Sequence, residues 1–514
     1  MIIRRHFILI LTLALAVSLN ANGQIIYISP ESETNRLIAE LQAQSLLSDL
    51  PHGERPLLAA DVLKSIAMDS LEIWGDKRVR AGKIINHLKP PQVTREFSAG
   101  ANFDVSAFGH LHDKNDGYFI YRNRQLLRNQ SKEGSIGTKA GFFISQNDRW
   151  GAETSLIFET DGVNFPWYYG TPHRGKIIGQ FDKSYFALKL DKFRFLFGRQ
   201  RIGWGPSPRG SLLIDYSIPP LDMVYYSFDL RPFTLSGFSS ILDDFIDPIS
   251  GRPINRYLSG HRLRLNPGKG WEIALSEVFL YGGIDRGLEL YYNFPLLLYY
   301  WEAQNRRLDD NAFWALDISW VKSGFGRFYG QFIADDIQRQ NRGPQKLAAQ
   351  LGLHIFPQSN PDWSGLFELN YIDTYVYGQR QWHNTYSHWG QPIGRLDSDQ
   401  LEFFAALYKR FGAEIRTGAE ITYRTKGEYD IADPYPIQLP SNGKFPSGIV
   451  ENSANFAVIL DWVYSSAMET QIAAGYQTIE NFRNQSGVSI DQPFIFFNIT
   501  YGLKTGLPFW KRHY

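Results

Sequence analysis

The chain has 514 residues, with 53 lysines and arginines against 52 aspartates and glutamates, so its formal net charge is +1. A nucleic-acid-binding protein usually shows a basic excess, and this balance argues against a nucleic-acid partner. Cysteine is absent, which excludes disulfides, thiol catalysis and cysteine-based zinc sites.

The N-terminus has the three parts of a secretory signal peptide. Arg4 and Arg5 supply a positive start, residues 7–19 form a short apolar core, and residues 21–23 (Ala-Asn-Gly) are suited to a cleavage site. We therefore expect residues 1–23 to be removed. The mature chain contains no apolar run of about 18 residues, which excludes a helical membrane protein.

Residues 24–92 carry a helical pattern. Leu37, Ile38 and Leu41 share one helical face, and apolar residues recur at the same spacing around 59–66 and 84–88. So few apolar positions do not build a core alone. We expect a small helical segment held against a larger body, with an independent ligand-binding module as the alternative.

From residue 93 to residue 514 the period changes to two. Over 186–197 one face is phenylalanine and leucine, and the other carries Lys189 and Arg194. The segment 261–275 repeats this pattern. Two architectures give each strand one apolar and one charged face: a soluble sandwich, and a membrane barrel with lipid outside and water inside.

Three features favour the barrel. Several strands reach roughly ten residues, the length that a tilted strand needs to cross a bilayer. Tight turns such as Asp191-Lys192 alternate with long connections such as 373–398. Aromatic residues, including Trp363 and Trp462, gather near strand ends, where interfacial girdles lie. The fold class predicted for 93–514 is an all-β, large antiparallel transmembrane β-barrel of about 16–18 strands, with a lumen wide enough for water, a ligand or a plug.

The stretch GRQRIGWGPSPRGSLLIDYSIPPLD, from Gly198 to Asp222, interrupts the strand pattern. It is not a phosphate-binding loop, because no Gly-Lys-Ser/Thr follows and no helical pattern comes after it. Its glycines and prolines end a strand and allow sharp turns or close approach of the backbone. Arg199, Arg201 and Arg209 are then presented at a strand end or at the mouth of the lumen. One interpretation is a folded-in loop whose arginines pair with carboxylates of the barrel wall.

Five segments occur in a distinctive order along the barrel region: GRQRIGWGPSPRGSLL, SEVFLYGG (276–283), LYYNFPLLLYYWEAQN (290–305), DDNAFWALDISW (309–320) and FIADDIQ (332–338). In these segments the sequence resembles the capsule-assembly Wzi family of outer-membrane barrels. The resemblance implies an outer-membrane barrel with a periplasmic helical bundle, and a lectin-like role in holding capsular or other exported polysaccharide at the cell surface.

Two regions are candidates for contact with such a polymer. The arginine-rich stretch could pair with an acidic sugar instead of with the barrel wall. The stretch 378–394 places aromatic rings beside amide and imidazole groups, which suits the apolar face and hydroxyl rim of a sugar; girdle aromatics and ordinary loop packing are the alternative. The candidate polysaccharide-binding residues are Arg199, Arg201, Trp204, Arg209, Trp382 and Trp389.

Nothing in the sequence makes a positive case for catalysis. Paired acids such as Asp243-Asp244 point to opposite faces when they lie on a strand, so turns or salt bridges with lumen arginines are favoured over acid–base work on glycosides. No nucleophile–base motif can be assembled, and no cofactor or metal site is predicted.

The barrel pattern and the absence of a catalytic motif predict a non-enzymatic protein in the outer membrane of a Gram-negative-type bacterium, and the family resemblance implies that it binds exported polysaccharide. Its other expected contacts are outer-membrane lipid and polysaccharide export machinery. A porin or solute-specific channel and an outer-membrane barrel enzyme remain as alternatives. The expected division is a signal peptide at 1–23, a periplasmic helical segment at 24–92 and the barrel at 93–514.

Overall fold

The computed structural model describes residues 25–506, apart from 31, 71, 74–75, 89–96, 113–116, 122–123, 129–131, 147–148, 161–176, 337–345, 413, 434–442 and 466. The predicted signal peptide, residues 1–23, lies outside the described residues. No helix in the described part is long and apolar enough to cross a membrane.

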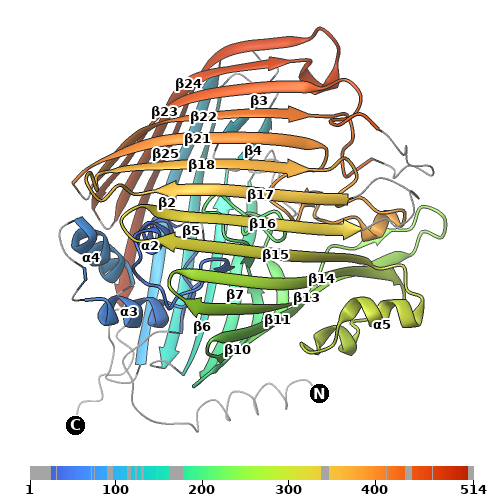
Figure 1. Cartoon of the computed structure of the whole chain (residues 1–514), viewed down its shortest axis with the longest axis horizontal. Helices are drawn as coiled ribbons and strands as arrows, with labels where there is room; N and C mark the ends of the chain where they lie inside the picture. The colour runs from blue at the N-terminus through green and yellow to red at the C-terminus, as the bar shows by residue number, and fades with distance from the viewer. Residues whose placement is uncertain are drawn as a thin grey trace.

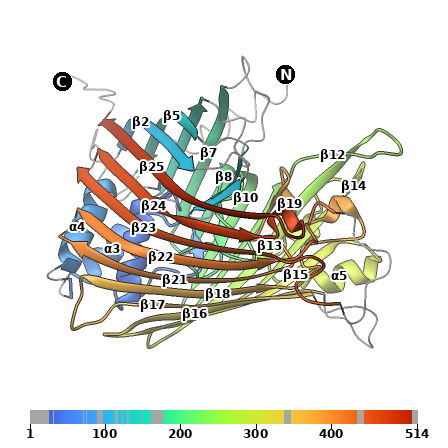
Figure 2. The ribbon, with the colours of Figure 1, turned by 90° about the horizontal axis from the view of Figure 1, so that it is seen from above.

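In the described part of the chain, eighteen long antiparallel strands form one closed barrel, and the first, β2, pairs with the last, β25 (Figures 1 and 2). This confirms the predicted barrel and the upper end of the predicted strand number, and it excludes the sandwich. The strands are β2 (Phe97–His112), β5 (Lys132–Gln146), β6 (Trp150–Glu159), β7 (Ile178–Leu190), β8 (Phe193–Gln200), β10 (Leu221–Leu230), β11 (Phe233–Ile241), β13 (Pro253–Gly268), β14 (Trp271–Ile284), β15 (Asn311–Lys322), β16 (Gly326–Asp336), β17 (Lys346–Ile355), β18 (Trp363–Ile372), β21 (Gln400–Phe411), β22 (Ile415–Lys426), β23 (Glu451–Ser465), β24 (Met468–Glu480) and β25 (Ser489–Gly506).

The two faces of each strand follow the period-two pattern of the sequence. On β13 and β14, Arg262 and Glu272 point into the lumen and are buried, whereas Leu263 and Leu275 on the outer face are exposed. Phe197 on β8 is 60 % exposed on the outer face. An apolar outer face with a charged interior is the pattern of a barrel that stands in lipid.

Short turns and long connections lie at opposite ends of the barrel. The turns at 191–192, 269–270 and 323–325 lie at the end where the N-terminal helices sit, and the connections 285–310 and 373–399 lie at the other (Figure 1). We call these the helix end and the loop end.

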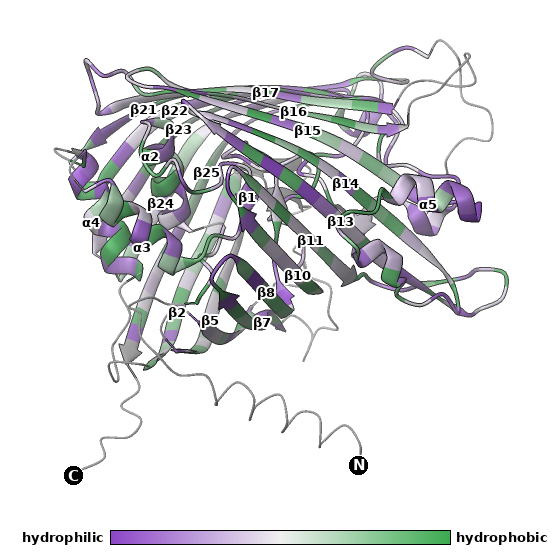
Figure 3. Ribbon diagram, turned by 60° about the horizontal axis from the view of Figure 1, so that its bottom comes forward, coloured by the Kyte–Doolittle hydropathy of each residue, from purple (hydrophilic) through white to green (hydrophobic). Residues whose placement is uncertain are grey.

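The N-terminal helices lie at the helix end of the barrel (Figure 1). They are α2 (Glu33–Ala43), α3 (Ala59–Met68) and α4 (Asp76–Leu88). Figure 3 shows α2 and the short strand β1 (Glu54–Arg55) enclosed by the barrel strands. Leu37, Ile38 and Leu41 on α2 are wholly buried against Val62 and Ile66 of α3. Glu40 and Gln42 on the polar side of α2 are buried as well, and Glu40 pairs with Arg410 of the barrel wall.

One segment packs against the outside of the barrel. The helix η2 (Leu290–Asn293) and α5 (Tyr299–Arg306) cover an outward-facing contact between Glu277 and His261, whose atoms Oε2 and Nε2 are 3.1 Å apart. The amides of Tyr299 and Tyr300, at the start of α5, donate to Glu277 at 2.8 and 2.9 Å. The segment therefore shields two polar side chains that would otherwise interrupt the apolar outer face.

Candidate functional site

The stretch between β8 and β10 folds into the lumen. Its short strand β9 (Gly203–Trp204) pairs with β1, and the amide of Gly205 donates to the carbonyl of Gly53 at 3.0 Å. A loop from the wall and the N-terminal segment thus meet inside the barrel. This is the folded-in arrangement that the sequence indicated as one interpretation.

The glycines of this loop are required by close packing. A Cβ atom at Gly205 would lie 2.3 Å from Oγ of Ser211, and one at Gly210 would lie 2.5 Å from Oδ1 of Asp215 and 2.8 Å from Cδ of Arg395. The loop therefore has no room for a side chain at these points.

The three candidate arginines of this region do not share one site. Arg201 and Arg209 line a lumen cavity, whereas Arg199 lies on the outer face of β8, where its Nε and Nη2 donate to Asp222 at 2.8 and 2.6 Å. Arg201 pairs with Asp182. Arg209 pairs with two wall carboxylates, those of Glu368 at 3.1 Å and Glu402 at 3.0 Å, and its guanidinium lies 3.6 Å from the ring centre of Phe404. All three arginines thus pair with acids of the barrel itself.

Trp204 lies in the core of the folded-in loop. Its side chain has no solvent exposure, and its ring contacts Phe238 edge-on at 5.1 Å between centroids. A polymer at the surface does not reach a ring in this position, so we do not carry Trp204 into the proposed binding surface.

A second loop, 373–399, packs on top of the first from the loop end. Tyr377 and Tyr386 donate through their hydroxyls to the carbonyls of Leu212 and Leu213, at 2.6 and 2.9 Å. Arg395 also donates, from its amide, to the carbonyl of Ser211 at 2.8 Å. The two regions that the sequence singled out are therefore in direct contact and together fill this part of the lumen.

The second loop presents Trp382 and Trp389 at its surface. They are 41 % and 43 % exposed, and Trp382 stacks on Phe245 at 4.8 Å between centroids. We call Trp382, Trp389 and Phe245 the tryptophan rim.

A buried arginine that the sequence analysis missed holds the rim in place. Arg256 on β13 is wholly buried and donates to the carbonyls of His383, Thr385 and Ser387, at 2.6, 2.8 and 2.9 Å. Its Nη1 also donates to Asp243 at 3.0 Å, which is the kind of salt bridge predicted for the paired acids. The period-two pattern places Arg256 inside the barrel, but no local signal names its partners.

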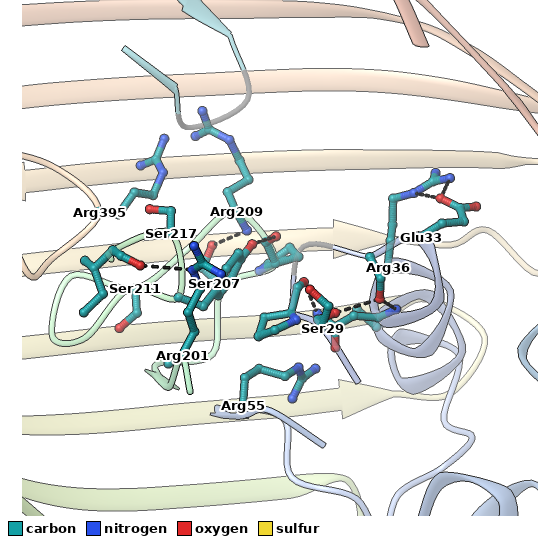
Figure 4. Close-up of a pocket in the computed structure, with 18 of the residues that line it drawn as sticks. Ser29, Glu33, Arg36, Arg55, Arg201, Ser207, Arg209, Ser211, Ser217 and Arg395 are labelled. Carbon is teal, nitrogen blue, oxygen red and sulfur yellow. Dashed lines mark hydrogen bonds and ion pairs between the residues drawn. The ribbon is translucent and has the colours of Figure 1, made fainter. Parts of the chain in front are cut away.

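Between these loops and the wall from β21 round to β7 lies a cavity of about 1300 Å³. Figure 4 shows Arg201, Arg209 and Arg395 on its walls, with Arg36 on the helix. Both acids and bases line it, and the lining runs from His87 and Lys504 near the helix end to Asp430 and Arg483 near the loop end. Among the residues that the structure describes, no three histidine or acidic side chains are grouped to hold a metal ion.

The buried carboxyl group of Asp215 in the folded-in loop predicts a pH-dependent stability. Burial raises its pKa from 3.8 to about 6, against the opposing effect of hydrogen bonds from Ser217 and Ser211. The folded state therefore binds this proton more tightly than the unfolded state, so the stability contribution is full below pH 3.8 and is lost as the pH rises through about 6. Its expected size is about 2 to 3 kcal/mol.

Asp215→Asn removes this contribution. We expect the difference in unfolding free energy between wild type and variant to change by about 2 to 3 kcal/mol between pH 4 and pH 7, measured by denaturant unfolding in lipid vesicles. A difference that does not change with pH would show that this carboxyl group titrates normally.

Comparisons with known proteins agree with the barrel. The family model described as capsule assembly protein Wzi matches residues 92–492. No curated protein sequence matches the chain. Among solved structures, the chain is similar to the Escherichia coli outer-membrane protein Wzi, which is described as a carbohydrate-binding β-barrel involved in group 1 capsule assembly. The two chains are 16 % identical, with a TM-score of 0.62, and the match covers 95 % of this chain and 99 % of that one. It is more distantly similar to OprD of Pseudomonas aeruginosa (7 % identity, TM-score 0.46, coverage 81 % and 98 %) and OccAB4 of Acinetobacter baumannii (10 % identity, TM-score 0.45, coverage 80 % and 99 %).

Proposed function

The chain belongs to the capsule assembly protein Wzi family, and from this premise we propose that it is a non-enzymatic outer-membrane barrel that binds exported polysaccharide and retains it at the cell surface. The Escherichia coli relative is described as carbohydrate-binding and involved in capsule assembly. The observation in this chain that carries the proposal is the tryptophan rim, whose two indole rings are partly exposed at the loop end of the barrel.

The rim suits a sugar polymer for two reasons. Flat indole faces beside His383 and Gln391 match the apolar face and hydroxyl edge of a sugar ring. The hydrogen bonds from Arg256 fix the backbone that carries the rim, so little ordering is needed when a sugar binds. A repeating polymer contacts many barrels at once, so weak binding at each site gains avidity through effective concentration.

The cavity arginines have a secondary place in this proposal. Arg201 and Arg209 line the cavity but already pair with wall acids, which supports a structural role for them before a binding role. Arg199 lies on the outer face and supports no polymer contact from inside the lumen.

We further propose the orientation and the division of the chain. The loop end faces the outside and the helix end faces the periplasm, because short periplasmic turns and long outer loops are the rule in such barrels. Residues 1–23 are then a removed signal peptide, 24–92 a periplasmic segment positioned to meet export machinery, and 93–514 the barrel, with lipid on its apolar outer face.

The folded-in loops and the N-terminal segment together argue against the alternative of an open solute channel. The first loop is held to the wall by buried groups such as Gln331, whose Oε1 accepts from the amide of Leu212 at 2.8 Å. A retention protein needs no open lumen, whereas a porin does.

Removing the rim tests the proposal. We expect Trp382→Ala with Trp389→Ala to leave total polysaccharide unchanged and to raise the shed fraction. Binding of purified polymer should weaken by about tenfold or more, since tryptophans that a bound partner covers dominate contact energies. The matched control is Trp462→Ala, an exposed tryptophan of 38 % exposure on the outer face of β23 near the helix end. Equal retention by the rim variant and the control would contradict a binding role for the rim.

A further inference from the structure

Four basic side chains meet inside the barrel near its helix end. They are His52 and Arg55 of the N-terminal segment, Arg327 of β16 and His354 of β17. Arg327 and His354 lie directly opposite each other on neighbouring strands, and both point into the lumen. Nη2 of Arg327 donates to the carbonyl of Pro206 at 2.6 Å.

The chain around Gly53 completes this inner basic cluster. Pro206 follows Gly205, whose amide donates to the carbonyl of Gly53. His52 directly precedes Gly53 and Arg55 follows it by two residues. Nδ1 of His52 lies 3.0 Å from Oγ of Ser319 on β15. The cluster is therefore assembled from the N-terminal segment, the folded-in loop and the barrel wall.

The guanidinium groups of this cluster have no acidic partner in the described part of the chain. Arg55 donates to the carbonyls of Pro51, His52 and Glu54 and to the amide oxygen of Gln42, all of them neutral. Arg327 makes the single bond to Pro206, and its Nε has no acceptor among the described residues. Nδ1 of His354 also lacks a partner there.

The nearby carboxylates are already occupied. Glu272 accepts from the amides of His52 and Gly53 at 3.0 Å and pairs with Arg264 at 3.4 Å. Glu40 is shared by three arginines, Arg36, Arg80 and Arg410. Neither acid forms an ion pair with Arg55 or Arg327. Glu54 and Glu368, the other carboxylates near them, pair with Arg264 and Arg209, so both guanidinium groups lack an ion-pair partner in the described part of the chain.

Burial makes this arrangement costly. Arg327, whose charge has no ion-pair partner among the described residues, is 1 % exposed, and His354, whose Nδ1 has no hydrogen-bond partner there, is 7 % exposed. A buried unpaired charge and an unsatisfied buried donor are both rare in folded proteins, and each calls for a specific reason such as a bound ion.

The cluster also borders open space. His52, Arg55, Arg327 and His354 all line the cavity of about 1300 Å³, which has room for a small anion beside them. Figure 4 shows Arg55 at the wall of this cavity.

We infer that the inner basic cluster is a binding site for an oxyanion group, a carboxylate or a phosphate, held chiefly by the forked guanidinium of Arg327. Guanidinium groups bind such oxyanions through paired, charge-assisted hydrogen bonds, and His52 and His354 add donors on either side. The site lies at the opposite end of the lumen from the tryptophan rim, and it does not rest on the proposed retention of polysaccharide.

Calorimetric titration of the full-length mature protein in detergent tests this inference, with inorganic phosphate, sulfate and glucuronate as separate probes. We expect saturable one-to-one binding of at least one probe by the wild type. Phosphate or sulfate alone would assign the site to a free or phosphoryl oxyanion, and glucuronate would assign it to an acidic sugar.

The variants locate the site. We expect Arg327→Gln, and separately Arg55→Gln, to weaken binding by about tenfold or more, because each removes a charged donor. Arg306→Gln, an equal loss of charge at an exposed position on α5, is expected to bind as the wild type does. Two results would overturn the inference. In the first, the wild type binds none of the three probes, and this result does not depend on the folding of any variant. In the second, Arg327→Gln and Arg55→Gln both bind as tightly as the control.

Discussion

Glu40→Gln is expected to release the N-terminal helices from the barrel. Both carboxylate oxygens of Glu40 accept from Nη2 of Arg410 on β21 at 2.7 Å, and Arg80 and Arg36 approach to 3.4 and 3.5 Å. Burial alone would raise its pKa, but these three guanidinium groups hold the pKa of Glu40 well below its usual range. Removing the carboxylate leaves three guanidinium groups close together without this shared partner. We expect the substitution to lower the free energy of unfolding by about 3 to 5 kcal/mol.

The expected consequence is an open lumen. Single-channel recording on reconstituted protein should show little conductance for the wild type and long open events for Glu40→Gln, and protease should cleave the N-terminal segment of the variant faster. The matched control is Glu72→Gln, which makes the same chemical change at an exposed position after α3. A wild type that already conducts would favour the channel alternative. A variant that stays closed and protease-resistant would mean that apolar packing, such as that of Leu37 and Leu41, holds the plug without Glu40.

The barrel wall could be predicted from sequence because its physics is local. A strand alternates its faces, so the parity of each residue decides whether it meets lipid or the lumen. Arg262 and Leu263 lie on the faces that this parity predicts. The same rule places Arg199 outside, because it shares parity with Phe195 and Phe197. Arg199 therefore belongs to the strand pattern of β8 and not to the loop that contains Arg201 and Arg209.

The filling of the lumen could not be predicted in the same way. Helix α2 has an apolar face and a polar face, which in an isolated surface helix would mean a buried side and a solvated side. Here Glu40 and Gln42 on the polar side are buried too, because the helix stands inside a wall whose inner face carries charges. The sequence gives the periodicity of the helix but not its surroundings.

Contacts between residues far apart in the sequence are the other part of the candidate site that could not be predicted. Arg209 pairs with Glu402, which is 193 residues away, and Arg256 holds a backbone 127 to 131 residues away. Such contacts depend on which loops fold inward, and composition does not determine that. Gly205 and Gly210 are the sequence features that come closest to indicating these contacts, since glycines in a loop between strands indicate close approach of the backbone. They do not identify the segment that approaches.

Trp204→Ala is expected to cost about 3 to 5 kcal/mol of unfolding free energy, the range for removing a large buried aromatic side chain. The ring fills space between Phe238 and Gly260, where a Cβ added at Gly260 would lie 3.1 Å from it. The backbone of Trp204 is fixed independently, by bonds to Ile214 and to Nε2 of Gln331 at 2.9 Å each. The loop is therefore unable to collapse fully onto the cavity that the substitution leaves.

The matched control is Trp382→Ala, the same chemical change at the exposed rim, for which we expect a loss of about 1 kcal/mol or less. Denaturant unfolding in lipid vesicles measures both stabilities, and binding of purified polymer is measured beside them. If Trp204 is a packing residue and Trp382 a contact residue, the two variants give opposite patterns. Trp204→Ala lowers stability and, once folded, retains polymer binding, whereas Trp382→Ala lowers binding and retains stability. A Trp204→Ala variant of normal stability that no longer bound polymer would show that the folded-in loop opens to admit the sugar, because a ring with no exposure contacts a ligand only after the loop has moved.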